Sequence, residues 1–371
     1  MIYFCEVNKC GGEHASVNSK LLSLVHRWDP AARIGVYLST DHWAEICRLG
    51  DHRQYASLRR IRVIEPVWKD KLRWLIKIVL ECTTLMRILV EARRERPRLI
   101  FLTSLSPFAN YVLHGLLRLY NRVPVIVVLH GELQLLAQRN PKLVDRWYAR
   151  WLNKVLRTVR KNRKFLILGP EIRQQLLDRF GYPAAHFLTV PHPTSDGASR
   201  LRPATTEKAG GVVFGYLGTA KLAKNAQLFF GLADKLRAEV QAGRARFIVS
   251  GQVFPEMTTF VHRWVTCSGV NQPVAYAEYM ERCLQMDYAI FFNSDENYNL
   301  ISSGSVMDAV TFGIPIIALR SAMVERLFGL CQSPPGVLCE DLQDMEQTVC
   351  RLIEAGPESV SAFSRGVEEL K

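Results

Sequence analysis

Short apolar runs alternate along the chain with longer segments in which apolar residues recur every three or four positions. The short runs predict buried strands, and the longer segments predict helices that cover them. In the first half the expected strands are Ile2–Val7, Arg33–Ser39, Ile61–Ile64, Leu99–Thr103, Val125–Leu129 and Phe165–Leu168. The expected helices are Glu13–Trp28, Asp41–Leu49, Lys69–Arg94, Pro107–Tyr120, Lys142–Lys161 and Glu171–Phe180. This alternation is typical of a parallel sheet covered on both faces.

The stretch Pro191–Gly211 is rich in proline and small polar residues, and we interpret it as a linker. A second alternating series follows. Its expected strands are Val212–Leu217, Phe247–Ser250, Tyr288–Phe292 and Ile314–Ala318. Its expected helices are Asn225–Val240, Tyr276–Gln285, Ser305–Phe312 and Leu342–Ala355. The pattern predicts an α/β protein of two Rossmann-like domains, residues 1–195 and 196–371, whose parallel sheets face one another across a ligand-binding cleft. The last helix is expected to pack back on the N-terminal domain.

Composition is that of an ordinary globular protein, with 371 residues, 48% apolar side chains and 22% charged ones. Charge, however, is divided unevenly along the chain. Residues 1–200 carry 33 basic and 16 acidic side chains, a net of +17, whereas the remainder is net −4. This asymmetry indicates that the two domains meet different partners.

The sequence indicates a cytoplasmic protein. Nine scattered cysteines form no CxxC pair, as expected in a reducing compartment. Met1–Val7 is interpreted as a strand, so no signal peptide is expected. The apolar stretch Trp74–Val90 contains Lys77, Glu81 and Arg87. Burying these charges in a bilayer is costly, so we expect no membrane-spanning segment.

The first expected strand runs into the loop Asn8-Lys9-Cys10-Gly11-Gly12-Glu13-His14. Gly11 and Gly12 let a backbone approach a ligand closely, and the helix that follows offers free N–H groups to an anion. Glu13 and His14 are both capable proton acceptors. The alternative is that the two glycines only make a tight turn.

A second polar group follows the expected strand Val125–Leu129, which delivers His130 and Glu132 at its carboxyl end. Polar residues at this edge of a parallel sheet are placed for ligand binding. A structural histidine is the competing interpretation. His130, Glu132, Glu13 and His14 are therefore the candidates for the reacting end of the site.

Two segments of the second half suit a diphosphate. In the first, Gly218-Thr219 is followed by Lys221 and Lys224 just before an expected helix, although a solvated lysine pair would give the same pattern. In the second, the helix start Ser303-Gly304-Ser305 offers hydroxyls and free N–H groups, and Asp308 follows one turn later, where a carboxylate accepts ribose hydroxyls.

Taken together, these segments resemble the GT-B glycosyltransferases, in particular the group-4 family of bacterial sugar transferases. Gly11-Gly12-Glu13 is similar to the family's N-terminal acceptor loop. The stretch from Gly218 to Asn225 resembles its G-R-x-x-x-K-N donor loop. The segment from Asp308 to Ala318 resembles its E-A-M-A-x-G-x-P-V-V-A motif, the only specific one. The resemblance implies a nucleotide-sugar bound by the C-terminal domain and an acceptor bound by the N-terminal domain.

The sequence also departs from that family. Thr219 stands where the donor loop usually has arginine, and Leu300 stands where the first of two glutamates is usual. Glu296, twelve residues before Asp308, is the nearest substitute, and we expect it to touch the sugar or the ribose. These departures indicate an outlying branch in which Ser303, Gly304 and Ser305 take over phosphate contacts. No DxD triplet occurs, so a metal-free mechanism is expected, with lysine and a helix dipole carrying the leaving charge.

The segment Arg139–Lys164 holds ten basic residues and one acid in 26 positions. Its basic residues recur every three or four positions beside a stripe of Trp and Leu, which is typical of an interfacial helix on an anionic bilayer. The expected contacts are Arg146, Trp147, Arg150, Trp151 and Lys154. A solvated helix face is the alternative. Nucleic acid is not expected as a partner, because no helix-turn-helix signal, RNP motif or zinc-finger spacing is present.

The sequence thus predicts a metal-independent hexosyltransferase without a cofactor, peripheral on the inner face of the plasma membrane. Its donor would be a UDP- or GDP-linked sugar. Its acceptor would be a lipid-diphosphate-linked glycan or a polysaccharide in surface-glycan synthesis. Two other classes stay open at this point: a GT-B nucleotide-sugar epimerase, and a non-enzymatic basic protein that binds lipid or nucleic acid.

Overall fold

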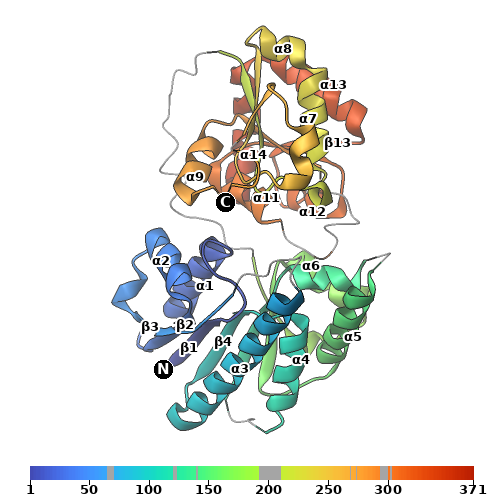
Figure 1. The fold of residues 1–371 in the computed structure, drawn as a ribbon. Helices are drawn as coiled ribbons and strands as arrows, with labels where there is room; N and C mark the ends of the chain where they lie inside the picture. The colour runs from blue at the N-terminus through green and yellow to red at the C-terminus, as the bar shows by residue number, and fades with distance from the viewer. Residues whose placement is uncertain are drawn as a thin grey trace. The chain divides into compact units, whose positions relative to one another are not determined.

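The computed structural model describes residues 1–64, 71–119, 123–138, 141–191, 210–267, 269–272, 274–292, 300 and 303–371. The chain divides into two compact units. One comprises Met1–Pro193 with Leu300–Ser302, and the other comprises Thr194–Asn299 with Ser303–Lys371. Figure 1 colours the first unit from blue to green and the second from yellow to red.

The first unit is built on a seven-stranded parallel sheet in the order β3-β2-β1-β4-β5-β6-β7. Its strands are β1 (Ile2–Glu6), β2 (Ile34–Leu38), β3 (Ala56–Arg60), β4 (Leu99–Ser104), β5 (Val125–Leu129), β6 (Arg163–Leu168) and β7 (Phe187–Val190). The strand order reverses at β1, which lies between β2 and β4. A ligand site of a doubly wound sheet is expected beside such a reversal, at the carboxyl ends of the strands.

Helices cover both faces of this sheet (Figure 1). Their bounds are α1 (Ala15–Trp28), α2 (Thr40–Leu49), α3 (Lys71–Glu95), α4 (Pro107–Leu116), α5 (Leu143–Arg157) and α6 (Pro170–Asp178). One apolar core contains side chains of α1 and α2, and a separate core contains side chains of α3 to α6. The strands β1, β2 and β4 are buried along their whole length, which explains their continuous runs of apolar residues.

The second unit has a six-stranded parallel sheet in the order β10-β9-β8-β11-β12-β13. Its strands are β8 (Val212–Tyr216), β9 (Ala245–Val249), β10 (Val265–Thr266), β11 (Tyr288–Phe291), β12 (Ile316–Leu319) and β13 (Gly336–Cys339). Its helices are α7 (Ala226–Lys235), α8 (Arg237–Gln241), α9 (Tyr276–Leu284), α11 (Gly304–Phe312), α12 (Ala322–Phe328), α13 (Leu342–Ala355) and α14 (Ser361–Leu370). Short 3₁₀ helices occur at His52–Gln54, Gly131–Leu136, Ala184–His186, Leu222–Lys224, Pro255–Phe260 and Pro357–Val360.

The expected α/β fold with two parallel sheets is confirmed, and one expected strand is wrong. Residues 61–64 are not a strand; the third strand of the first sheet is β3, Ala56–Arg60, which ends just before them. β3 is an edge strand in which only Ala56 is buried, whereas Ser57 and Arg60 are exposed. The neighbouring apolar cluster Ile61–Ile64 therefore gave a stronger strand signal than the strand itself.

Other differences concern short or late elements. The helix expected over Asn225–Val240 is two helices, α7 and α8, which meet at Leu236. The strands β7, β10 and β13 and the helix α12 were not expected, and the expected last helix had no bounds. The last helix, α14, packs on α11 and β13 within its own unit.

Candidate functional site

The loop after β1 is fixed by hydrogen bonds from α2. Gly11 has a φ of +55°, which favours glycine, and its N–H donates to Asp41 Oδ2 over 2.7 Å. The Gly11 carbonyl in turn accepts from Nδ1 of the buried His42 over 2.6 Å. Partial burial acts to raise the pKa of Asp41, but the nearby Ser39 hydroxyl and the backbone N–H groups of Gly11 and His42 outweigh it and lower the pKa. Both polar groups of Gly11 are thus held by α2, while Gly12 is exposed.

Three of the four expected reacting residues lie together at this edge of the sheet. The rings of His14 and His130 have centroids 4.6 Å apart. His14 adopts a left-handed conformation at φ 61° as the residue before α1, and His130 follows β5 directly. Burial raises the pKa of Glu132, while the neighbouring His130 acts to lower it. Oε1 of Glu132 is buried without a hydrogen-bond partner among the described residues.

One of the two ring nitrogens of His130 is assigned by its partner. Nε2 lies 2.7 Å from the carbonyl oxygen of Thr103, which only accepts, so Nε2 carries a proton and donates it. In the neutral ring Nδ1 is then the basic nitrogen. Glu13, in contrast, does not join this group. Its half-exposed carboxylate forms an ion pair with the ammonium of Lys9, four residues earlier in the loop.

The candidate donor residues of the second unit meet where β8 ends and α11 begins. Gly218 has a φ of +85°, and a Cβ at this position would lie 3.3 Å from Cβ of Ser305. This spacing leaves no comfortable room for a side chain. Ser303 precedes the helix, Gly304 is its first residue, and the hydroxyls of Ser303 and Ser305 are 3.2 Å apart. The free N–H groups of the α11 N-terminus therefore lie beside the Gly218 loop.

The two lysines of the donor loop differ in their surroundings. Lys221 places its ammonium 3.8 Å from the ring centroid of Phe254, a cation–π contact. Burial, and then the neighbouring Lys221, lowers the pKa of Lys224, whereas Asp308 acts to raise it. Asn225 anchors this loop, because its side-chain amide donates to the carbonyl of Phe292 over 3.0 Å. The site therefore concentrates positive charge beside a helix N-terminus.

Asp308 is held by a residue that sequence reasoning missed. The hydroxyl of Tyr279 on α9 donates to Oδ2 of Asp308 over 2.7 Å. Tyr279 has a strongly raised pKa, because it is buried and lies beside the Asp308 carboxylate. A tyrosine on an amphipathic helix gives no distinct signal, since core packing explains it equally well. Glu296 lies outside the described residues. Thr219 is half-exposed, and no contact with another described residue assigns it a role.

The basic helix α5 keeps only part of its expected apolar stripe on the surface. Leu143 and Trp147 are 78% and 61% exposed, and Arg146, Arg150 and Lys154 on the same helix are exposed as well. Val155 is instead a core residue. Trp151 is half-buried, with its ring centroid 4.9 Å from that of Phe108 and 5.7 Å from that of Trp147. Trp151 therefore packs against Trp147, and its expected contact with a membrane stays a prediction.

Sequence reasoning also missed Glu6, the last residue of β1. It is fully buried and accepts hydrogen bonds from the loop that follows and from β4 and α1. A single acid at the end of an apolar run is the signal that could have identified it, because a buried carboxylate requires partners.

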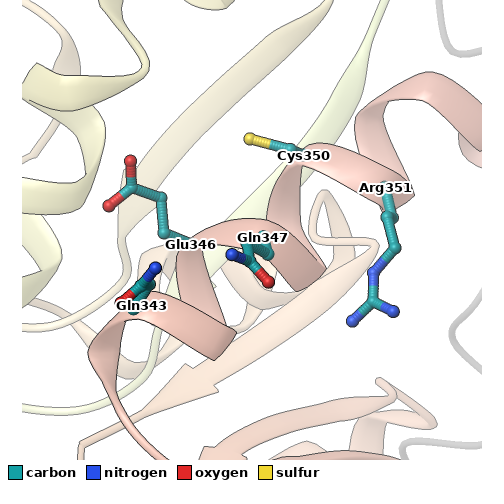
Figure 2. Close-up of a pocket in the computed structure, with 5 residues that line it drawn as sticks. All are labelled: Gln343, Glu346, Gln347, Cys350 and Arg351. Carbon is teal, nitrogen blue, oxygen red and sulfur yellow. The ribbon is translucent and has the colours of Figure 1, made fainter.

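Other features of the described residues lie apart from these groups. A surface hollow of about 650 Å³ is lined by side chains of α13 (Figure 2): Gln343, Glu346, Gln347, Cys350 and Arg351. It contains none of the expected site residues. Across the described ranges, no group of three or more His, Cys, Asp or Glu side chains is placed to hold a metal ion. No helix in the same ranges combines the length and apolar character needed to cross a membrane.

Comparison with known proteins shows similarity of fold without similarity of sequence. No protein-family model matches the chain, and no curated protein matches it in sequence. HepE of Anabaena, solved with UDP and glucose, has a TM-score of 0.61 and 13% identity over 100% of this chain and 93% of that one. Sucrose-phosphate synthase of Thermosynechococcus elongatus has a TM-score of 0.66 and 12% identity over 100% of this chain and 94% of that one. A UDP-N-acetylglucosamine 2-epimerase has a TM-score of 0.57 and 9% identity over 99% of this chain and 90% of that one. The chain therefore has the two-domain fold of the GT-B glycosyltransferases, which confirms the expected resemblance at the level of fold.

Proposed function

We propose that this protein is a glycosyltransferase that moves a hexose from a nucleotide-sugar to an acceptor hydroxyl. The observation that carries the proposal is the group at the start of α11. A glycine loop, two lysines and the free N–H groups of Ser303, Gly304 and Ser305 are gathered beside one carboxylate, Asp308. A diphosphate suits the cations and N–H groups, and a ribose suits the carboxylate. The domain formed by residues 196–371 would thus bind a UDP- or GDP-linked sugar.

In this proposal the acceptor oxygen attacks the anomeric carbon while the bond from that carbon to the diphosphate oxygen breaks. Lys224, Lys221 and the α11 N-terminus stabilise the charge that develops on the leaving diphosphate, with no metal ion required. The proton of the acceptor has two destinations. In an inverting reaction it passes to Nδ1 of His130. In a retaining reaction it passes to the leaving diphosphate.

The domain formed by residues 1–195 would bind the acceptor, with Gly11 and Gly12 at the approach and His14 beside His130. We propose a lipid-diphosphate-linked glycan as the acceptor, presented at the inner face of the plasma membrane in surface-glycan synthesis. The exposed Trp147 with Arg146 and Arg150 supports this choice, because an exposed tryptophan flanked by cations suits an anionic bilayer. A soluble acceptor would leave the exposed Trp147 and the cations beside it without a binding partner.

The function is tested first by thermal unfolding with UDP, GDP, dTDP, CMP and their sugars, with and without EDTA. A nucleotide present at a hundred times its Kd adds about 2.7 kcal/mol to the free energy of unfolding. We expect one nucleotide to stand out irrespective of EDTA, followed by transfer of its sugar to a lipid-diphosphate acceptor. Stabilisation by no nucleotide in the panel, with a folded protein, would contradict the proposal.

Membrane contact is tested separately by co-sedimentation with anionic vesicles. The double variant Arg146→Gln/Arg150→Gln removes two surface charges, each worth about 1 kcal/mol near an anionic surface, so we expect binding to weaken about 30-fold. The matched control is Arg237→Gln/Arg246→Gln, two exposed arginines of the second unit, which should bind as the wild type does. Equal binding of both double variants would exclude α5 as the contact.

An epimerase is the second candidate, because UDP-N-acetylglucosamine 2-epimerases share this fold. An epimerase would bind a nucleotide-sugar equally well and would need no acceptor. The two functions separate when the nucleotide-sugar is incubated alone. A change of the sugar or its release without an acceptor supports the epimerase, whereas dependence on a lipid-diphosphate acceptor supports the transferase.

A further inference from the structure

The carboxylate of Glu6 is fully buried at the carboxyl end of β1 and is surrounded by hydrogen-bond donors. Oε1 accepts from the backbone N–H groups of Asn8 and Lys9 over 2.9 and 3.0 Å, and from the hydroxyl of Ser104. Oε2 accepts from the hydroxyl of Thr103 over 2.8 Å and from the side-chain amide of Asn18 over 3.2 Å. Five donors from three elements therefore converge on one side chain.

One branch of this network reaches the glycine loop through α1 and α2. Nδ2 of Asn18 donates both to Glu6 and, over 2.9 Å, to Nε2 of His42. Nδ1 of His42 then donates to the carbonyl of Gly11 over 2.6 Å. Because Nε2 accepts and Nδ1 donates, His42 is held in one neutral tautomer. The Glu6 carboxylate sets this arrangement, since it fixes which end of the Asn18 amide faces the two partners.

The second branch reaches the reacting end of the site. The hydroxyl of Thr103 donates to Glu6, and the carbonyl of the same residue accepts from Nε2 of His130 over 2.7 Å. Glu6 thereby positions the segment that assigns the proton of His130. One buried acid links the loop at Gly11 with the ring at His130, although it touches neither.

We infer that Glu6 is a positioning residue that holds the Gly11 loop and His130 in register for the acceptor. This inference rests on the proposed function, because it assigns the two linked features to the acceptor side. The site needs a carboxylate at position 6 and not merely a polar residue of the same size. A neutral isostere with one acceptor and one donor end cannot satisfy five donors.

Glu6→Gln exposes this requirement. The carbonyl of the new side chain must face the N–H groups of Asn8 and Lys9, since neither can accept. Its amide then faces Thr103, whose hydroxyl can accept, and Nδ2 of Asn18, which cannot. Asn18 must turn over and present Nδ2 to neither partner, so that its Oδ1 faces both the new amide and Nε2 of His42. His42 then takes a proton on Nε2, so it either loses the proton at Nδ1 and its bond to Gly11 or becomes charged.

Asn18→Asp supplies the matching rescue. In the double variant Glu6→Gln/Asn18→Asp, the new carboxylate accepts from the new amide at position 6 and from Nε2 of a doubly protonated His42. Nδ1 of His42 again donates to Gly11. Asn18→Asp alone places two carboxylates side by side, so we expect its kcat to be lower than that of the wild type. The pair of substitutions is therefore expected to be strongly non-additive.

The activity test measures transfer with the full chain, with the donor and the acceptor varied separately. For Glu6→Gln we expect kcat to fall about 10²-fold, the effect of a small misplacement of reacting groups, with the KM for the donor within about twofold. The double variant should recover most of the loss. Glu45→Gln, on the surface of α2, is the control and should be unchanged. An unchanged kcat in Glu6→Gln, or no recovery in the double variant, would overturn the inference.

A second readout does not need the reaction. The ¹⁵N chemical shifts of the His42 ring report which nitrogen carries a proton. We expect a protonated Nδ1 and bare Nε2 in the wild type, a protonated Nε2 in Glu6→Gln, and protons on both nitrogens in the double variant. Identical His42 spectra in all three proteins would overturn the inference. If the wild type transfers no sugar but the His42 spectra change as expected, the proposed function fails while the network stands.

Discussion

The two strand edges that carry the candidate residues are built in different ways. In the first unit the edge is organised by buried side chains that bond to one another, from Glu6 through Asn18 to His42. In the second unit it is organised by main chain, where Gly218 approaches Ser305 at the start of α11. Main-chain N–H groups bind an anion whatever it is attached to, whereas a side-chain network fixes particular atoms in particular directions. We therefore expect the second unit to bind a diphosphate whatever group it carries, and the first unit to orient a reacting side chain.

The largest expected effect tests anion binding at the N-terminus of α11. Lys224→Ala removes a partly buried ammonium beside the α11 N-terminus, and we expect kcat/KM for the donor to fall about 10²- to 10³-fold. The fold should survive, because Lys224 lies in a short 3₁₀ helix outside the sheet. The control is Lys235→Ala on the exposed face of α7. Measured by calorimetry, an unchanged nucleotide affinity in Lys224→Ala would remove this residue from the donor site.

The next prediction concerns the first unit, where burial of an acid costs stability. Burial raises the pKa of Glu81 to about 7, although its hydrogen bonds from the N–H and hydroxyl of Ser106 oppose the shift. In the unfolded chain the pKa of Glu81 is about 4.5, so this carboxyl group binds its proton more tightly when the protein is folded. Stability from this group is fully present below about pH 4.5 and is lost as the pH rises towards and through 7, by about 3 kcal/mol at most.

Glu81→Gln removes this dependence, because an amide can accept from the Ser106 N–H and donate to its hydroxyl. Urea unfolding at several pH values between about 4.5 and 8 should show the wild type losing stability relative to Glu81→Gln as the pH rises. Glu95→Gln is an informative counterpart. Hydrogen bonds from Arg59 and Tyr3 lower the pKa of Glu95, so the wild type should gain stability relative to Glu95→Gln as the pH rises. Parallel wild-type and Glu81→Gln curves would show that Glu81 ionises normally.

The sequence was sufficient for the sheets but not for the networks. Strands such as β1 and β5 are apolar almost throughout, because both faces of each are covered, and this pattern is local and unambiguous. The helix expected over Ser305–Phe312 begins one residue earlier than expected, at Gly304. An edge strand such as β3 gave a weak signal, because one partner and partial cover demand few apolar residues.

Residues that act through contacts distant in sequence could not be found in this way. Glu6 meets Thr103, 97 positions away, and Tyr279 meets Asp308, 29 positions away. Periodicity assigns each of these residues to a buried face and says nothing of its partner. His130 was found because it follows a strand, but the proton on its Nε2 depends on the carbonyl of a neighbouring strand.

The smallest expected effect asks whether the second unit also contains an oriented side chain. Tyr279→Phe removes one hydrogen bond to Asp308, so we expect a loss of about 1 kcal/mol, or about fivefold, in nucleotide affinity. If Asp308 holds the ribose, calorimetry should show the loss for UDP or GDP but not for inorganic pyrophosphate. Tyr288→Phe is the matched control, since its hydroxyl bonds to Ser359 rather than to a candidate site residue. Equal losses for pyrophosphate and nucleotide would mean that Tyr279 supports the α11 N-terminus as a whole, and the main-chain account of this edge would then be complete without Asp308.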